Sequence, residues 1–452
     1  MIFRTDTQTI EDLNLLGKFK KNSIFSQFNQ CYTAGGERAL EKMFNQPLTD
    51  PTAINNRSRI FQLFQQVDLD LPFDTKELEL AILYLQGEST STWLGNAMLH
   101  GRRKLNTLLG IKQEDEQLKL GFIAWLTILR KLRPMVVNLH DKHGPILQHD
   151  PVLSNAWLQD EKALANFNSI QSAQQLTLSR FLKADNQIRG SKLTLMQDLL
   201  ALIYQLDVYI SVAKVAKARR LNYAEAFPAD DNRIHAKNIR HLAITGAVGN
   251  DISFDAKQNL FFLTGANMAG KSTFMKSFGI SMYLAHMGFP VPADVLQFAV
   301  KDGLFTSINV SDNLNMGYSH YYAEVLRVKQ VATAVSEKSR LIVIFDELFK
   351  GTNVKDAFEA TYAVTKAFQR FKQCFYLIST HIVEVGEELR KHDPAITFRY
   401  MPTVMLGSTP TYPYIAKEGI SSDKHGMILI ENEGILSLLE KPQASPTAKL
   451  NE

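Results

Sequence analysis

The sequence predicts a mixed fold: an all-α core/lever domain over residues 1–230, an α/β P-loop NTPase domain over residues 231–440, and a flexible tail over residues 441–452. Three observations predict this order. Apolar residues recur at helical spacing in the first half, and short apolar runs alternate with helical patterns in the second half. One of these runs leads directly into a glycine-containing phosphate-loop pattern.

The first half has the periodicity of long helices. Glycine is sparse there, and the alternation that is typical of strands is weak. Steps of three and four residues place one apolar set on a single helical face. This set consists of Met196, Leu199, Leu200, Ile203, Leu206 and Ile210. The polar, proline-bearing stretch 227–232 then predicts a break between two domains.

The second half alternates between buried strands and helices. The apolar runs Leu260–Leu263, Leu341–Phe345 and Phe375–Ile378 each precede a turn signal and a helical pattern. Such alternation indicates βαβ units and a largely parallel sheet. The final residues, 441–452, are polar and contain proline, so we expect a frayed tail.

Composition limits the classes of partner. A chain of 452 residues with 45% hydrophobic and 21% charged residues is typical of a folded protein of two or three domains. Because the net charge is only +4, a nucleic-acid surface would have to be a local patch. Two cysteines, no signal-peptide pattern and no apolar run judged long enough to cross a bilayer predict a cytoplasmic protein that does not enter a membrane.

The phosphate-loop pattern supplies the first candidate site. It runs through Gly265, Ala266, Asn267, Met268, Ala269, Gly270, Lys271 and Ser272. Glycines let backbone N–H groups turn toward phosphate oxygens, and the following helix adds the positive end of its dipole. In this chemistry Lys271 reaches the β- and γ-phosphates of ATP, and Ser272 ligates Mg²⁺. The alternative is a chance match in a glycine-rich turn, but the strand before it and the helix after it favour the site.

A pair of carboxylates supplies the second candidate site. The run Leu341–Phe345 ends in Asp346 and Glu347. In the predicted chemistry Asp346 holds the magnesium shell, and Glu347 is the general base for the attacking water. The alternative is a carboxylate pair that only caps a strand. The nearby phosphate loop favours the catalytic interpretation.

Around these motifs the chain resembles the MutS mismatch-repair ATPases. Residues 264–273, TGANMAGKST, resemble the family's TGPNMGGKST, with alanine at two positions. Residues 346–352, DELFKGT, resemble its DELGRGT, and residues 379–381, STH, resemble its ATH. The resemblance implies that Thr273 joins the nucleotide-binding set and that His381 senses the γ-phosphate or the attacking water.

The resemblance also implies a dimer. Residues 311–324 resemble the segment that reaches the ATP of the other subunit, with Ser319 as the serine offered in trans. His320 and Tyr321 depart from the usual threonine and phenylalanine. Ala247 and Val248 occupy the region where an aromatic residue often packs on adenine. The expected assembly is a homodimer through the ATPase domains, with composite sites that bind ATP and Mg²⁺.

The N-terminal half resembles the family's helical core and lever, most clearly at residues 33–38 and 46–51 and again at residues 206–216. Full mismatch sensors begin with a mismatch-recognition domain and a connector, whereas this sequence starts at the core-like segment. The interval 102–189 is also short for a complete DNA clamp. We therefore expect a short form with a reduced or absent clamp.

Three functional hypotheses follow. The first is an ATP-dependent, DNA-binding switch of the MutS type that acts in mismatch repair or related DNA transactions. The second is an ATPase that binds branched or recombination DNA without mismatch specificity. The third is a nucleotide-gated module that contacts repair or recombination proteins and does not bind DNA. A transporter-type ATPase is disfavoured because the sequence contains no LSGGQ-like signature.

A basic helix end leaves two interpretations open. Lys214, Lys217, Arg219 and Arg220 close the lever-like helix, and Arg102, Arg103 and Lys104 form a second cluster. These residues could meet DNA phosphates. Cations are also common on a solvated face and at a helix C-terminus, where they complement the helix dipole.

Overall fold

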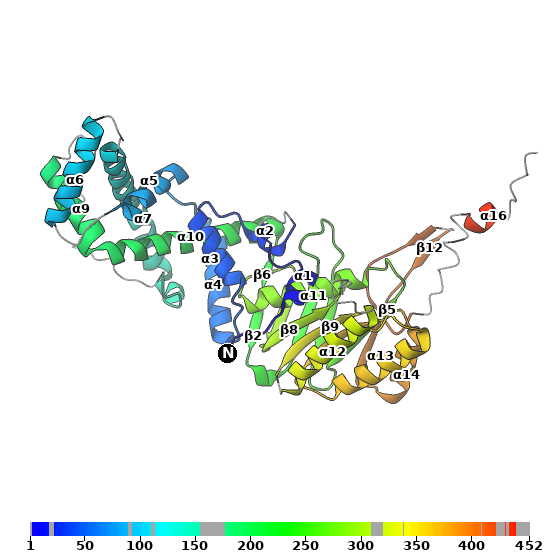
Figure 1. Ribbon diagram of the computed structural model, residues 1–452. Helices are drawn as coiled ribbons and strands as arrows, with labels where there is room; N and C mark the ends of the chain where they lie inside the picture. The colour runs from blue at the N-terminus through cyan, green and yellow to red at the C-terminus, as the bar shows by residue number, and fades with distance from the viewer. Residues whose placement is uncertain are drawn as a thin grey trace, which may run out of the picture.

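The computed structural model describes residues 2–17, 22–88, 93–109, 114–153, 177–308, 320–337, 339–407, 409–421, 430 and 434–439. Figure 1 shows two lobes, an elongated helical lobe and an α/β lobe, with one long helix running between them. The mixed helix-and-sheet fold that the sequence predicts is confirmed.

The helical lobe is built from segments on both sides of a gap in the described chain. Its helices are α2 (Ile24–Phe28), α3 (Ala34–Phe44), α4 (Pro51–Val67), α5 (Thr75–Gln86), α6 (Trp93–Leu108), α7 (Glu114–Leu147), α9 (Leu178–Asn186), the π-helical turn η3 (Gln187–Ser191) and α10 (Leu193–Arg219). Side-chain caps begin several of them, as where Asp50 accepts a hydrogen bond from the Ala53 N–H at the start of α4. Helices α5, α6, α7 and α9 gather at the end of α10 that lies away from the sheet (Figure 1).

Helix α10 confirms the predicted apolar face between residues 196 and 210, and its buried residues continue as far as Ala216, before an exposed last turn. The expectation that no apolar run could span a bilayer is wrong for this helix, because its 27 residues meet the length and composition of a span. However, 72% of its most apolar stretch is buried within the protein. Its apolar surface is therefore covered by other parts of this chain.

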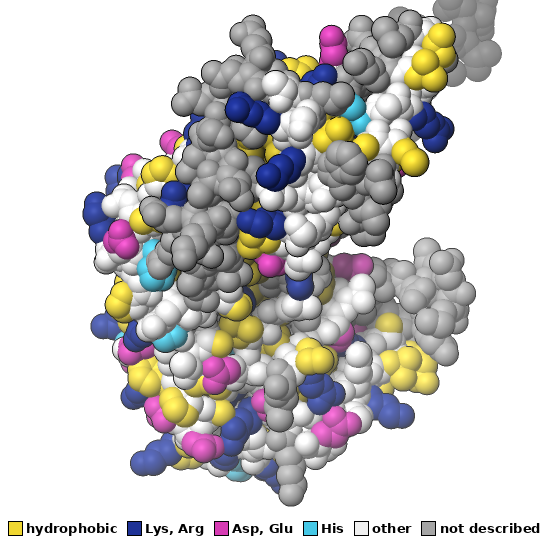
Figure 2. Space-filling model, turned by 90° about the vertical axis from the view of Figure 1, so that its left-hand side faces the viewer, with side chains coloured by type: hydrophobic (Ala, Val, Ile, Leu, Met, Phe, Trp, Pro, Cys, Tyr) yellow, Lys and Arg dark blue, Asp and Glu magenta, His cyan; other side chains and the backbone are white. Residues whose placement is uncertain are grey.

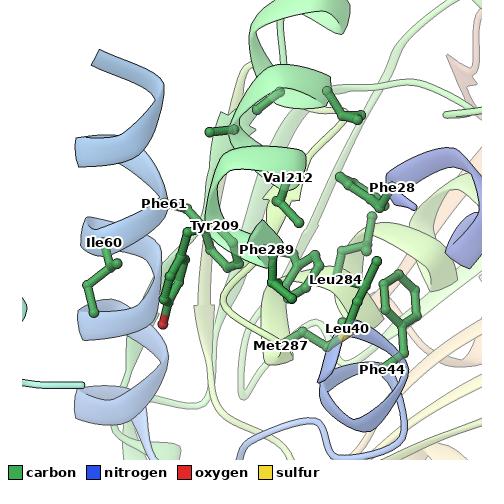
Figure 3. Packing of buried hydrophobic residues seen from close by; sticks show 14 of the residues in the cluster. Phe28, Leu40, Phe44, Ile60, Phe61, Tyr209, Val212, Leu284, Met287 and Phe289 are labelled. Atoms are coloured by element: carbon green, nitrogen blue, oxygen red, sulfur yellow. The ribbon is translucent and has the colours of Figure 1, made fainter. Parts of the chain in front are cut away.

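The two lobes share one core. Figure 3 shows side chains of α3, α4 and α10 packed against the end of helix α11 (Lys271–His286) and the residues that follow it. The Phe289 ring is central, since its centroid lies 4.8 Å from that of Phe61, 5.4 Å from that of Phe44 and 5.6 Å from that of Phe28. Because α11 begins at the phosphate-loop pattern, this core joins the candidate site to the lever.

The α/β lobe contains the remaining elements. They are β1 (Asn222–Tyr223), β2 (Glu225–Phe227), η4 (Ala229–Asp231), β3 (Ile234–Ile239), β4 (Asn250–Phe254), β5 (Leu260–Gly265), α11, β6 (Pro290–Val291), β7 (Val295–Ala299), β8 (Gly303–Ser307), α12 (His320–Ser336), β9 (Leu341–Asp346), α13 (Val354–Gln369), β10 (Phe375–Ser379), α14 (Val383–His392), β11 (Ile396–Met401), β12 (Val404–Leu406), β13 (Thr409–Thr411), β14 (Lys417–Glu418) and α16 (Ile435–Leu439). Strand β1 pairs with β6, and β2 pairs with β7. The chain therefore enters this lobe at Asn222, before the stretch 227–232 where the sequence pattern changes from helical spacing to alternating strands and helices.

The central sheet has the strand order β14-β11-β5-β10-β9-β8, and all its neighbouring strands are parallel except β14. The three predicted strands are β5, β9 and β10, and the parallel sheet is confirmed. Alternate residues of β5 face opposite sides. Phe261 and Leu263 pack with α11, whereas Leu260 and Phe262 pack in the cluster that includes residues of α12, α13 and α14. Helices thus cover both faces.

The start of the chain closes the β8 edge of this sheet. Arg4 bridges to Gly303 in parallel, and helix α1 (Thr7–Asp12) lies beside β8. The buried Asp12 carboxylate accepts hydrogen bonds from the Thr306 hydroxyl at 2.7 Å and from the Ile308 N–H at 2.8 Å. This segment therefore satisfies polar groups of an edge strand that would otherwise be exposed. The predicted tail over residues 441–452 lies outside the described residues.

Candidate functional site

The candidate site lies at the carboxyl edge of the central sheet, where three neighbouring parallel strands end together. The register pairs Ser379 of β10 with Asp346 of β9 on one side and with Leu263 of β5 on the other. Beyond the strands, the Thr380 N–H donates to the Leu263 carbonyl at 3.2 Å. The carboxyl edge of an open parallel sheet is the usual location of a ligand site in α/β proteins.

The loop between β5 and α11 depends on glycine at two positions. Gly265 has φ of 140° and Gly270 has φ of 100°, values that L side chains rarely adopt. A Cβ atom at Gly265 would lie 2.7 Å from the Met401 carbonyl oxygen, and one at Gly270 would lie 2.8 Å from the Tyr414 ring. The loop therefore tolerates no side chain at either position, and it delivers the N-terminus of α11 to the site.

Lys271 is the first residue of α11 and is only 4% exposed. Its ammonium group donates to the carbonyls of Gly265 at 2.9 Å and Ala266 at 3.2 Å, and it lies 3.9 Å from a carboxylate oxygen of Glu347. Burial lowers the pKa of Lys271, while the neighbouring carboxylates of Glu347 and Asp346 oppose that shift. The Lys271 ammonium group is thus held against the loop, at the place where a phosphate group would bind.

The predicted carboxylates lie opposite this loop. The Asp346 carboxylate accepts hydrogen bonds from two hydroxyl groups, that of Ser272 on one oxygen and that of Ser379 on the other. Glu347 follows in the left-handed region, with φ of 53°. The structure therefore brings Lys271 and Ser272 together with Asp346 and Glu347 from two separate segments, as the sequence predicts.

These groups line a cavity of about 720 Å³. Its walls come from the phosphate loop and the first turns of α11, from the carboxylate segment, and from residues 239–250, and Ile308 and Tyr414 complete the lining. Among the predicted nucleotide-binding residues, the cavity is lined by Ala266, Asn267, Met268, Gly270, Lys271, Ser272 and Thr273. Gly265 and Ala269 are not in this lining, because both are buried in the supporting layer of the loop.

The oxygen donors suit magnesium. The Ser272 hydroxyl and the Asp346 carboxylate are in hydrogen-bond contact at the mouth of the loop. Mg²⁺ prefers hard oxygen ligands and is often held by one or two protein groups together with substrate phosphates and water. Within the described residues no cluster of three or more His, Cys, Asp or Glu side chains could form a cage for another metal. The donor set therefore fits Mg²⁺ beside a phosphate chain.

Two aromatic residues that line the cavity, Phe274 and Tyr414, are not marked by the sequence pattern. Tyr414 packs its ring against Gly270, and its backbone has φ of 60°. Asn250 holds it in place, because the Asn250 amide donates to the Tyr414 carbonyl at 2.9 Å and accepts from the Ala416 N–H at 2.7 Å. No local pattern marks Tyr414, which reaches the loop only because the chain returns after β13. An aromatic wall thus exists although Ala247 and Val248 replace the expected one.

The structure does not place either of the two remaining predicted catalytic residues in this cluster. His381 follows Thr380 at the carboxyl edge, but its side chain is exposed and is not among those that line the cavity. Ser319 lies outside the described residues, directly before α12. The roles of both residues stay predictions.

The basic side chains at the end of α10 form ion pairs and hydrogen bonds with other residues of this chain. Lys217 pairs with Asp68 at 2.7 Å, and Lys214 pairs with Asp70. Arg219 donates to the Leu242 carbonyl at 2.9 Å, on the segment that lines the cavity. These contacts favour the structural interpretation of the cluster over contact with DNA phosphates. Figure 2 shows other Lys and Arg side chains spaced along the face of the helical lobe.

Comparison with known protein families gives matches in both lobes. A family model described as MutS domain III matches residues 8–213, and one described as MutS domain V matches residues 261–440. The first match covers the segments that form the helical lobe and α1, and the second covers both halves of the candidate site.

Curated relatives have matching names. The DNA mismatch repair protein MutS of Pseudothermotoga lettingae is 28% identical over 253 residues, which is 55% of this chain and 30% of that protein. The proteins of the same name from Clostridioides difficile and Streptococcus agalactiae are 31% identical over 192 residues and 27% identical over 311 residues. These two matches cover 41% and 62% of this chain. They span 20% and 35% of the relatives, so the chain corresponds to about a third or less of their length.

Proposed function

The chain belongs to the MutS family, and from this premise we propose that it is a DNA-coupled ATPase whose nucleotide site is the cavity at the carboxyl edge of the central sheet. One observation carries the proposal. Lys271, Ser272, Asp346 and Glu347 come from segments about 75 residues apart in sequence and meet at the same cavity. Their chemistry matches the needs of phosphoryl transfer to water.

The phosphate chain would lie on the loop before α11. Backbone N–H groups at the start of α11 and the positive end of its dipole favour the negative charge there. Lys271 exchanges its hydrogen bonds with the Gly265 and Ala266 carbonyls for phosphate oxygens. Because the lysine is already buried beside the loop, little reorganisation is required.

Ser272 and Asp346 would hold Mg²⁺, with the serine hydroxyl and one carboxylate oxygen as the protein's contribution. When bound, the ion would neutralise charge that develops on the phosphate oxygens during hydrolysis.

Glu347 is the proposed general base. Water attacks the γ-phosphorus in line, the bond from that phosphorus to the bridging oxygen breaks, and the products are ADP and inorganic phosphate. The water's proton moves toward the Glu347 carboxylate as the new bond forms. The 3.9 Å separation between Glu347 and Lys271 supports this role, because the base then lies beside the group that orients the γ-phosphate. His381 is proposed to sense that phosphate or the water.

The base of the nucleotide would occupy the apolar side of the cavity. Tyr414 places its ring next to the loop, and Ile239, His241 and Ile244 line the same cavity. Burial and the positive charge of Lys276 lower the pKa of His241, which favours the neutral form of its ring. A neutral, largely apolar wall suits a purine ring.

The wider assembly follows from the family. We propose a homodimer through the ATPase domains, in which Ser319 completes the partner's site, and a cytoplasmic location. The core around Phe289, which reaches Tyr209 of α10 through Phe61, would pass changes at α11 to the lever helix and on to a DNA-holding region. Mismatch repair and the handling of branched or recombination DNA are both within this proposal.

A second candidate is a nucleotide-gated module that contacts proteins and not DNA. The observation that favours it is the pairing of Lys214 and Lys217 with Asp70 and Asp68, which removes basic charge from the end of the lever.

Steady-state ATPase activity of the purified protein tests the proposal and separates the candidates. The rate is measured alone and with homoduplex, single-mismatch duplex or four-way-junction DNA, with Glu347→Ala as the control for contaminating activity. Stimulation by one DNA form supports the DNA-coupled switch and identifies its substrate class. An ATPase that responds to none of them favours the protein-interaction module, and absence of ATPase activity refutes the proposal.

A further inference from the structure

We infer that Ser379 is a positioning residue that fixes both carboxylates of the proposed ATPase site, orienting Asp346 for the metal and Glu347 for the water. The inference rests on the proposed function and deepens it. Ser379 ends β10, between the strands that carry the phosphate loop and the carboxylates. Its side chain is fully buried, so its hydroxyl can bond only to the protein groups around it.

The first contact orients the metal carboxylate. The Ser379 hydroxyl donates to Oδ1 of Asp346, while the Ser272 hydroxyl bonds to Oδ2. The two carboxylate oxygens are therefore assigned different partners. With Oδ1 tied to the buried strand, the carboxylate cannot rotate freely, and Oδ2 stays directed toward Ser272. A hydrogen bond to an ionised carboxylate is stronger than one between neutral groups.

The second contact fixes the backbone of the base. The Glu347 N–H donates to the Ser379 carbonyl at 3.1 Å and lies 3.3 Å from the Ser379 hydroxyl oxygen, which also accepts from it. Glu347 has φ of 53°, a left-handed conformation that costs free energy for a residue with a side chain. Hydrogen bonds from its N–H to the neighbouring strand help to hold that conformation and aim the side chain at the cavity.

One hydroxyl thus bridges the two acidic residues, accepting from the backbone of one and donating to the side chain of the other. Alanine at this position, as in the ATH motif that residues 379–381 resemble, keeps the backbone bond but loses both side-chain bonds. The metal carboxylate and the base would then be free to move independently. When a residue that orients a metal-binding carboxylate is removed, the affinity for the metal typically falls.

The test is the magnesium requirement of nucleotide binding in Ser379→Ala. The binding of a fluorescent, non-hydrolysable ATP analogue is titrated in EDTA and then against Mg²⁺. In EDTA the affinity should equal that of the wild type, because Lys271 and the loop are unchanged. The Mg²⁺ concentration for half-maximal enhancement should rise about tenfold. Mn²⁺ that replaces Mg²⁺ gives an independent reading of metal affinity by electron paramagnetic resonance.

Two further variants control the result. Ser281→Ala removes a buried hydroxyl on α11 that donates to the Ser277 carbonyl at 2.8 Å, away from both carboxylates, and it should bind like the wild type. Ser379→Thr retains a hydroxyl and should bring the magnesium requirement back toward the wild-type value.

The outcomes separate the two claims. If the wild type binds nucleotide with magnesium but Ser379→Ala has the same magnesium requirement, the positioning role is wrong and the proposed function stands. Equal weakening of binding in EDTA and in Mg²⁺ would also overturn it, because a purely structural defect is then sufficient. If the wild type shows no magnesium-dependent nucleotide binding, both claims fail.

Discussion

Two buried lysines lie at opposite edges of the same central sheet. Lys271 follows β5 at the carboxyl edge, and Lys301 precedes β8 at the amino edge. They are 4% and 1% exposed, and burial lowers the pKa of both ammonium groups. By burial and pKa alone, either residue would qualify as a functional lysine.

The surroundings of the two lysines differ. Lys301 donates to the Asn232 amide oxygen at 2.7 Å and to the Gln373 carbonyl at 2.9 Å, and its Nζ lies 3.5 Å from the centroid of the Phe375 ring. These contacts enclose it. Lys271 instead lines a cavity, beside two carboxylates and the N-terminus of a helix. A buried lysine with a lowered pKa therefore indicates a functional site only where it also lines a cavity and lies beside groups that could act with it on a ligand.

The largest expected effect is the loss of ATP hydrolysis at the carboxyl edge, without loss of nucleotide binding. Glu347→Gln should lower the rate of ATP hydrolysis about 1000-fold, because the side chain can no longer take the water's proton. Nucleotide affinity should be retained. Single-turnover hydrolysis and equilibrium binding measure the two quantities. Glu337→Gln, at an exposed ion pair with Arg4, is the control, and a near-normal rate in Glu347→Gln would contradict the assignment of the base.

The next effect contrasts the two lysines directly. Lys271→Met should weaken ATP binding about 30- to 100-fold, since a charged hydrogen-bonding group to phosphate is lost. Lys301→Met, an equally large change at the other edge, should leave the affinity within about twofold, because no nucleotide contact is removed. Isothermal titration calorimetry with ATP measures both. Similar losses of ATP affinity in the two variants would contradict the assignment of the nucleotide site to the carboxyl ends of the strands.

The pH dependence of the free energy of unfolding tests whether Lys301 is a structural lysine with a lowered pKa. Burial lowers its pKa from 10.5 in the unfolded chain to about 7 in the folded protein. Between these values the unfolded state binds more protons, so the free energy of unfolding rises with pH through this window. From pH 7 to pH 9, the wild type should gain about 1–2 kcal/mol relative to Lys301→Met. Urea denaturation at several pH values measures the difference, and parallel stability curves would refute a neutral Lys301.

The smallest effect concerns the base of the nucleotide. Tyr414→Ala should weaken ATP binding about fivefold, because the stacking surface beside Gly270 is lost. The affinity for inorganic triphosphate should not change, because that ligand has no base. Tyr32→Ala, which removes a tyrosine that is 63% exposed on the helical lobe, is the matched control. Equal losses for ATP and triphosphate would argue against a base contact.

Much of this site is local in sequence and could be predicted. The loop glycines, Lys271 and Ser272 lie within one turn and the start of one helix, and Asp346 and Glu347 directly follow an apolar strand. Because parallel strands end at the same side of a sheet, both motifs were expected there, although the placement of β10 between β5 and β9 was not predicted. The long apolar face of α10 was equally evident from its spacing.

The rest depends on contacts between distant segments. Tyr414 reaches the loop through Asn250, 164 residues away, and no spacing rule reports such a contact. The N-terminal segment covers β8 through Asp12 and Thr306, which are 294 residues apart. The length and hydropathy of α10 would allow a membrane span, and only its burial shows that other parts of this chain cover it. Tertiary packing supplies this information, and a single sequence does not contain it in readable form.

Photolabelling with 8-azido-ATP, followed by peptide mapping, tests most directly that the carboxyl-edge cavity is the nucleotide site. We expect labelling of the tryptic peptides 241–257 and 400–417, which carry the proposed base-binding walls, and loss of that labelling with excess ATP. Labelling that excess ATP does not reduce, or that falls on peptides around Lys301, would contradict it.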